Sequence, residues 1–175
     1  MTGRHGGAHT IGVAVGIPSP FREELEAARE RYEPSDHALP AHVTILAPVD
    51  VDADAMAAVF EHLERVTAET AQFTLQLQGS GSFRPVSPVV FVNVVAGGSD
   101  CERIERLVRS GDMAVETRFP YHPHVTVAHG VGEETLDRAL ADLAGYSASA
   151  QITSLGLYEH DDEGWRLLRE FPFGG

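Results

Sequence analysis

Two stretches of this chain share one pattern: PAHVTILAP at residues 40–48 and YHPHVTVAHG at residues 121–130. In both, a histidine, a valine, a threonine and a β-branched aliphatic residue follow one another, which is typical of a short strand. Because side chains alternate along a strand, His42 and Thr44 share one face while the aliphatic residues beside them face the core. The second stretch repeats this arrangement, so the sequence predicts two strands that each present a His-Thr pair.

The segments around the two strands also correspond. In each half of the chain the pattern predicts a strand, a helix, the HVT strand, a second helix and a further strand. His42 and His124 are 82 positions apart, and the strands that begin each half start near Thr10 and Val89, 79 positions apart. Two such units are too few for a solenoid. They predict two similar lobes that face each other across a pseudo-two-fold axis.

The element order indicates an α+β or α/β fold, because helices alternate with apolar strands. Strands expected at residues 151–158 and 165–171 are joined by a turn at 160–164, and this hairpin favours antiparallel pairing. An alternating strand is expected at residues 73–77. The glycine-, serine- and proline-rich segment 79–88 is interpreted as a loop.

Composition limits the classes of partner. The formal net charge of −13, with 26 acidic residues against 13 basic ones, repels an extended polyanion but leaves room for a small anionic ligand or an RNA end. Cys101 is the only cysteine, so an intramolecular disulfide and a cysteine metal cluster are excluded. The chain has no transmembrane run and no signal-peptide core at its start. We therefore expect a cytoplasmic protein that does not bind membranes and acts as a monomer.

If the pseudo-two-fold axis brings both His-Thr pairs to one cleft, that cleft holds two imidazoles and two hydroxyls. Cleavage of a phosphodiester needs a base that takes a proton from water or an alcohol and an acid that protonates the departing oxygen. Histidine serves either role near neutral pH, and threonine hydroxyls donate to phosphate oxygens. This chemistry requires no metal. The alternative interpretation is two structural histidines that happen to lie on strand faces.

At these motifs the sequence resembles the 2H phosphoesterase superfamily, which includes bacterial 2′-5′ RNA ligase-like proteins and RNA 2′,3′-cyclic phosphodiesterases. Members carry paired His-x-Thr/Ser-x motifs with hydrophobic x, here HVTI at 42–45 and HVTV at 124–127. GSFRPVSPVVFVNV (81–94) is similar to the family's central loop and strand, and LGLYEHDDEGWRLLREFPF (155–173) to its closing hairpin. The resemblance covers about residues 10–173.

The resemblance implies one domain over residues 1–175 with an α+β fold, in which two mainly antiparallel sheets line a central groove and helices lie outside. The lobes are expected at about 10–78 and 89–173, with terminal strands able to exchange between them. The implied reaction is hydrolysis of a 2′,3′-cyclic phosphate, on an RNA end or a small cyclic nucleotide, to a monoester, with 2′-5′ RNA ligation as a further activity. His42 and His124 carry over as the acid–base pair, and Thr44 and Thr126 as phosphate-binding hydroxyls. No cofactor is implied.

Further candidates for substrate binding surround the motifs. Tyr121 and His122 precede the second motif, and His129 follows it where many bacterial members have an arginine. Arg84 and Arg118 lie in segments expected near the cleft. Two other functions remain open at this point. One is a non-catalytic module that holds a nucleotide or RNA end, and the other is a metal-dependent hydrolase that uses His122, His124 and His129.

Overall fold

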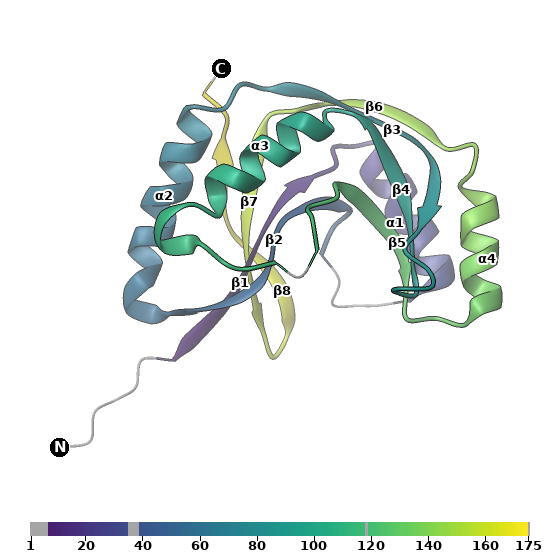
Figure 1. Cartoon of the computed structure of the whole chain (residues 1–175), viewed down its shortest axis with the longest axis horizontal. Helices are drawn as coiled ribbons and strands as arrows, with labels where there is room; N and C mark the ends of the chain where they lie inside the picture. The colour runs from purple at the N-terminus through teal and green to yellow at the C-terminus, as the bar shows by residue number, and fades with distance from the viewer. Residues whose placement is uncertain (1–6, 35–38, 118, 175) are drawn as a thin grey trace.

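The computed structural model of the chain describes residues 7–34, 39–117 and 119–174 (Figure 1). Within these residues the chain forms eight strands, four α-helices and two short 3-10 helices. In chain order they are β1 (Ala8–Gly16), α1 (Phe21–Tyr32), β2 (His42–Asp52), a 3-10 turn (Ala53–Ala55), α2 (Met56–Ala68), β3 (Phe73–Ser82), β4 (Val89–Ala96), α3 (Gly98–Val108), a 3-10 turn (Gly111–Met113), β5 (His124–His129), α4 (Glu133–Asp142), β6 (Ser147–Ile152), β7 (Ser154–Asp161) and β8 (Gly164–Pro172).

The strands form two antiparallel four-stranded sheets, which confirms the predicted α+β fold. The first sheet has the order β2-β1-β7-β8 and the second the order β5-β4-β3-β6. The two orders match when β1 is equated with β4 and β2 with β5, so an HVT strand lies at one edge of each sheet. The sheets do not coincide with residues 10–78 and 89–173. Terminal strands are exchanged between them, because β3 joins the second sheet and β7 and β8 join the first.

The helices cover the outer faces of the sheets, and two of them are exchanged as well. Helices α2 and α3 pack together against the first sheet, while α1 and α4 pack against the second (Figure 1). Helix α1 thus follows a strand of one sheet and covers the other. Its buried residues Leu25, Ala28 and Tyr32 share one face, and the Tyr32 hydroxyl donates to Asp142 of α4 at 2.6 Å. None of the helices in the described residues is long and apolar enough to cross a membrane.

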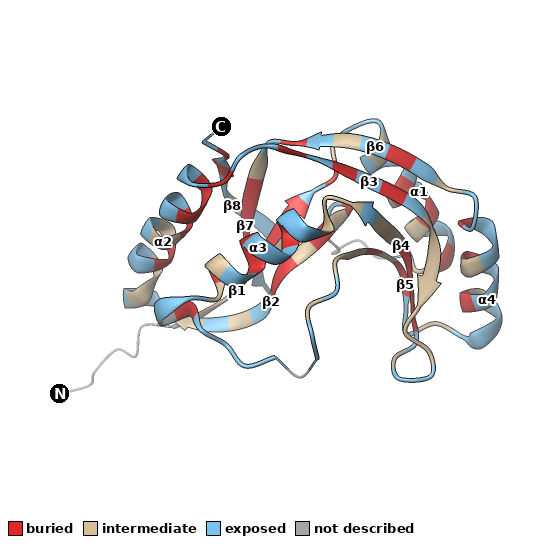
Figure 2. Ribbon diagram, turned by 45° about the horizontal axis from the view of Figure 1, so that its top comes forward, coloured by how far each residue is buried: buried red, intermediate tan, exposed pale blue. Residues whose placement is uncertain are grey.

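Burial follows the predicted two-residue alternation where a strand has only one face on the core (Figure 2). In β3, Phe73, Leu75 and Leu77 are buried and the polar residues between them are exposed, which confirms the strand expected at residues 73–77. The buried side chains of both sheets belong to one apolar cluster. This shared core fixes the two sheets relative to each other and so fixes the distance between their edge strands.

The prediction of a loop from residue 79 onward was wrong for its first four residues, because β3 continues to Ser82. Gly81 pairs with Phe91 of β4, and a β-carbon at Gly81 would lie 2.7 Å from the Phe91 ring. The glycine is therefore required by close packing inside a strand rather than by a turn.

The single strand expected at residues 151–158 was also wrong. The chain leaves the second sheet after Ile152 and enters the first at Ser154. The burial pattern changes phase at this point, since Ala148 and Ile152 are buried before it and Leu155 and Leu157 after it. The two segments bury opposite parities because they belong to different sheets, which approach the shared core from different sides.

Candidate active site

The two HVT strands carry the same irregularity at the same place. In the first sheet Thr44 pairs with Ala14 and Leu46 with Val13, so Ile45 is an extra residue that forms a β-bulge. A bulge re-aims the side chains that follow it and bends the strand. Here it buries Ile45 and Leu46 in succession, directly after the His-Thr pair.

The second sheet repeats this feature. Thr126 pairs with Phe91 and Ala128 with Val90, which leaves Val127 as the extra residue. Val127 and Ala128 are both buried, so the alternation is reset and His129 returns to the face that carries Thr126. The equivalent bulges show that the lobes share backbone geometry at the motifs as well as sequence.

Both motif histidines are fixed by the same backbone hydrogen bond. Nδ1 of His42 lies 2.8 Å from the Pro40 carbonyl oxygen, and Nδ1 of His124 lies 2.6 Å from the His122 carbonyl oxygen. A carbonyl oxygen only accepts, so Nδ1 of each ring donates its proton. The lone pair of each Nε2 is then available for proton transfer, as catalysis by a histidine pair requires.

The environment of both rings favours the neutral imidazole. Burial lowers the pKa of His42 below its ordinary value, and the positive charges of Arg29 and His124 lower it further, against the opposing effect of the bond to Pro40. Burial is also the main cause of the lowered pKa of His124. His124 therefore contributes to the electrostatic environment of His42, with a smaller effect than burial.

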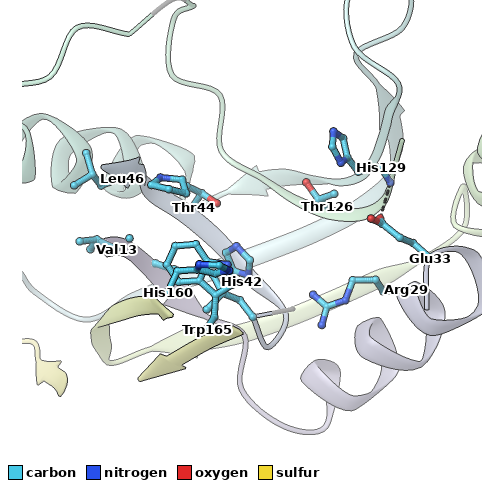
Figure 3. Close-up of a pocket in the computed structure, with 14 residues that line it drawn as sticks. Val13, Arg29, Glu33, His42, Thr44, Leu46, Thr126, His129, His160 and Trp165 are labelled. Carbon is cyan, nitrogen blue, oxygen red and sulfur yellow. Dashed lines mark hydrogen bonds between the residues drawn. The ribbon is translucent and has the colours of Figure 1, made fainter. Parts of the chain in front are cut away.

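A groove of about 420 Å³ lies between the sheets beside these motifs (Figure 3). Its lining includes His42 and Thr44 from β2 and Thr126 and His129 from β5, so both lobes contribute. Within the described residues, neither threonine hydroxyl has a hydrogen-bond partner in the protein, which leaves both hydroxyls for a ligand. His124 itself does not line this groove. Its ring is held edge-on against Phe83 and packs on Phe91 (Figure 3 shows the groove without it).

The structure places Tyr121 and His122 beside the groove rather than in its lining. The Tyr121 hydroxyl donates to the Thr44 carbonyl oxygen at 2.7 Å and ties the second motif's segment to the first motif's strand. Burial raises the pKa of Tyr121 above its usual range, which keeps it a donor. His122 is exposed, with its ring 5.3 Å from the centres of both Phe83 and Phe91.

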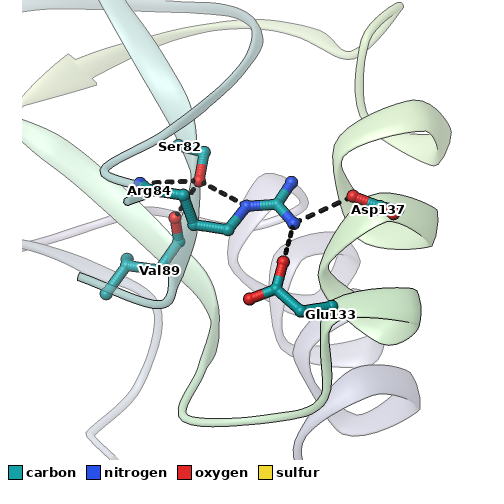
Figure 4. Close-up of polar contacts among 5 residues, drawn as sticks. All are labelled: Ser82, Arg84, Val89, Glu133 and Asp137. Atoms are coloured by element: carbon teal, nitrogen blue, oxygen red, sulfur yellow. Dashed lines mark hydrogen bonds and ion pairs between the residues drawn. The ribbon is translucent and has the colours of Figure 1, made fainter. Parts of the chain in front are cut away.

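The Arg84 side chain binds residues outside the groove (Figure 4). Its Nη1 lies 2.8 Å from both Glu133 and Asp137 of α4, and its Nε donates to Ser82 at 3.2 Å. It does not line the groove, because two carboxylates on one face of α4 hold the guanidinium. Arg118 lies outside the described residues.

The three histidines considered as metal ligands, His122, His124 and His129, are not gathered into a metal-binding cluster. In the ranges that the structure describes, no group of three or more His, Cys, Asp or Glu side chains could hold a metal ion.

The groove also contains residues that sequence reasoning missed. Arg29 of α1 and Glu33, which directly follows that helix, line it together with His160 and Trp165 of the β7–β8 hairpin. Glu33 accepts a hydrogen bond from the backbone N–H of His129 at 2.8 Å. Both residues lie at the C-terminal end of α1, four positions apart. The sequence gives no sign that this end of the helix meets β5, because α1 follows a strand of the other sheet.

Comparisons with known proteins agree with this geometry. The profile of the 2′-5′ RNA ligase superfamily matches residues 17–164. A protein of Oceanobacillus iheyensis named as a candidate phosphoesterase is 23% identical over 172 residues, which cover 93% of this chain and 97% of that one. One of Bacillus licheniformis with the same kind of name is 27% identical over 166 residues, covering 93% and 98%.

A solved structure with the same fold is that of Escherichia coli LigT with 3′-AMP. It superposes with a TM-score of 0.76 at 20% identity, and the match covers 97% of this chain and all of that one. The same Escherichia coli protein bound to ATP gives a TM-score of 0.72. Because the family profile spans most of the sequence, this chain belongs to the 2′-5′ RNA ligase superfamily and is a phosphoesterase of the 2H kind.

Proposed function

We propose that this protein hydrolyses a 2′,3′-cyclic phosphodiester, on an RNA end or a small cyclic nucleotide, to a phosphate monoester. The supporting observation is the matched pair of histidines, each on a bulged edge strand and each with Nδ1 donated to the carbonyl two residues earlier. Binding of 3′-AMP by the structurally similar LigT makes a nucleotide phosphate a suitable ligand for this groove.

In this mechanism one imidazole takes a proton from water through its Nε2, and the water oxygen forms a bond to phosphorus. The bond from phosphorus to one ring oxygen breaks, and the other imidazole, in its protonated form, gives its proton to that oxygen. The products are a phosphate monoester and a free hydroxyl. The hydroxyls of Thr44 and Thr126 donate to the non-bridging oxygens, where negative charge increases in the transition state.

The lowered pKa values of the two histidines suit the imidazole that acts as the base, because that ring must be neutral before it takes a proton. The acid must hold a proton, and a bound phosphate anion supplies the charge that raises the pKa of its neighbouring imidazole. When the 5′-hydroxyl of a second RNA takes the place of water, the same proton transfers form a bond from its oxygen to phosphorus, and the bond from phosphorus to the 3′ ring oxygen breaks, so that the two RNA ends are joined. Ligation through a 2′-5′ bond is therefore part of the proposal.

The test is turnover of nucleoside 2′,3′-cyclic monophosphates by the purified protein in EDTA. We expect metal-independent hydrolysis, reduced about 10²- to 10⁴-fold by His42→Ala and by His124→Ala, which is the usual contribution of a general acid or base. His9→Ala is the matched control, because His9 pairs with Glu159 away from the groove. It should retain wild-type turnover.

The outcomes separate the competing functions. Absent turnover, or turnover that survives both motif substitutions, rejects the proposal. Nucleotide binding without turnover favours the non-catalytic module. Activity that is lost in EDTA and restored by a transition metal favours the metal-dependent hydrolase.

A further inference from the structure

Among the described residues, no carboxylate pairs with Arg29, an arginine of α1 that lines the groove. Arg29 is half-buried and extends from α1 toward His42 (Figure 3). Glu33, four residues further on and just past the end of α1, does not pair with it and instead accepts the backbone N–H of His129. Across the described ranges, Arg29 has no ion pair and no hydrogen bond through its side chain.

Among the described arginines, three are half-buried: Arg29, Arg84 and Arg109. Arg84 and Arg109 each pair with at least one carboxylate, whereas Arg29 does not. A half-buried guanidinium loses hydration, and that loss is offset when the group gains a charged partner. An anion in the groove would supply the charged partner that no described residue supplies.

The position of Arg29 indicates where in the groove an anion would bind. Helix α1 packs on the second sheet, against β5, whereas His42 belongs to the first sheet. Arg29 therefore reaches the groove from the wall that carries Thr126 and His129, and it faces His42 across the space. The electrostatic effect of Arg29 on His42 supports this proximity.

We propose that Arg29 binds the non-bridging oxygens of the phosphate on which the two histidines act. The guanidinium fork donates to two oxygens, a geometry that suits a phosphate group. The inference rests on the proposed function for its substrate. It adds a cation, supplied by a helix exchanged between the lobes, to the imidazoles and hydroxyls of the two motifs.

The experiment compares Arg29→Gln, which removes the charge, with Arg29→Lys, which keeps the charge and loses the fork. Arg65→Gln is the matched control, because it makes the same charge change at an exposed position of α2 outside the groove. Two quantities are measured for each variant: kcat/KM for a cyclic nucleotide, and the Kd of inorganic phosphate by calorimetry.

We expect Arg29→Gln to lower kcat/KM about 10- to 100-fold, the size of one charge-assisted hydrogen-bonding contact, and to weaken phosphate binding. Arg29→Lys should recover part of both losses. Arg65→Gln should change neither by more than about twofold, as expected for a solvated surface charge.

The Kd of inorganic phosphate can be measured whether or not the protein catalyses the proposed reaction, so the two proposals are tested separately. If wild-type protein binds no phosphate, or if Arg29→Gln binds it as tightly as wild type, the proposal is overturned. A fall in turnover with unchanged phosphate affinity would mean that Arg29 acts only by tuning His42. If wild type binds phosphate through Arg29 but opens no cyclic phosphodiester, the proposed function fails and the anion site stands.

Discussion

At the scale of single residues, the two motif histidines combine catalytic geometry with a cost in stability at acid pH. Both have a folded-state pKa below the ordinary value of about 6.5. As pH falls through that value, unfolded imidazoles take up protons while the folded ones remain neutral. Protons thus favour the unfolded chain, and the free energy of unfolding decreases as pH falls toward the folded-state pKa values.

This pH dependence of the free energy of unfolding leads to a prediction for His42→Gln, in which a side chain that does not titrate replaces the imidazole. Between about pH 7.5 and pH 5.5 the variant should lose less unfolding free energy than wild type, because it lacks one group with a depressed pKa. Urea denaturation at both pH values measures the two losses. Equal losses would contradict the pKa shift of His42.

At the scale of elements, a glycine of β3 allows an aromatic residue of β4 to pack beside the second motif. Gly81 leaves space for the Phe91 ring, whose centre lies 5.1 Å from that of His124 and 4.5 Å from that of Phe83. The Phe91 side chain is buried and cannot simply swing aside. Gly81 thereby acts on the position of His124 without touching a substrate.

Gly81→Ala should therefore reduce both stability and turnover. A β-carbon 2.7 Å from the ring forces Phe91 to move, and overpacking of this kind costs about 1–3 kcal/mol. Thermal denaturation and kcat report the two effects. Gly145→Ala is the control, since nothing lies within 4 Å of a β-carbon at Gly145. A variant Gly81→Ala with normal stability and kcat would show that Phe91 adapts without disturbing His124.

At the scale of the whole molecule, the charge of −13 acts on any long anionic substrate. A single phosphate near Arg29 experiences a local attraction, whereas the distant phosphates of an oligonucleotide meet the net repulsion of the surface. Salt shortens the Debye length from about 30 Å at 0.01 M to about 8 Å at 0.15 M, so it screens the repulsion at long range most strongly.

We therefore expect the preference between substrates to depend on salt. Over that range the ratio of kcat/KM for a long RNA with a cyclic phosphate end to that for a cyclic mononucleotide should increase. Steady-state kinetics at several salt concentrations measure this ratio. A decrease of the ratio with salt, as shown by proteins that bind nucleic acid through basic surfaces, would indicate a local basic surface that binds RNA despite the negative net charge.

The sequence by itself determined the two His-Thr pairs, their placement on matched strands and the α+β class. These properties follow from local alternation of side chains and from a repeat, both of which are readable along the chain. It also indicated which segment carries the closing hairpin, because β7 and β8 follow short-range pairing rules.

Only the tertiary structure decided which surfaces meet around the motifs. It exchanged α1 and α3 between the sheets, brought Arg29 and Glu33 to the groove and held Arg84 on the carboxylates of α4. It also kept Gly81 inside a strand, where sequence alone suggested a loop. These outcomes depend on contacts between residues far apart in the chain, and such contacts are fixed by packing of the shared core rather than by any local pattern.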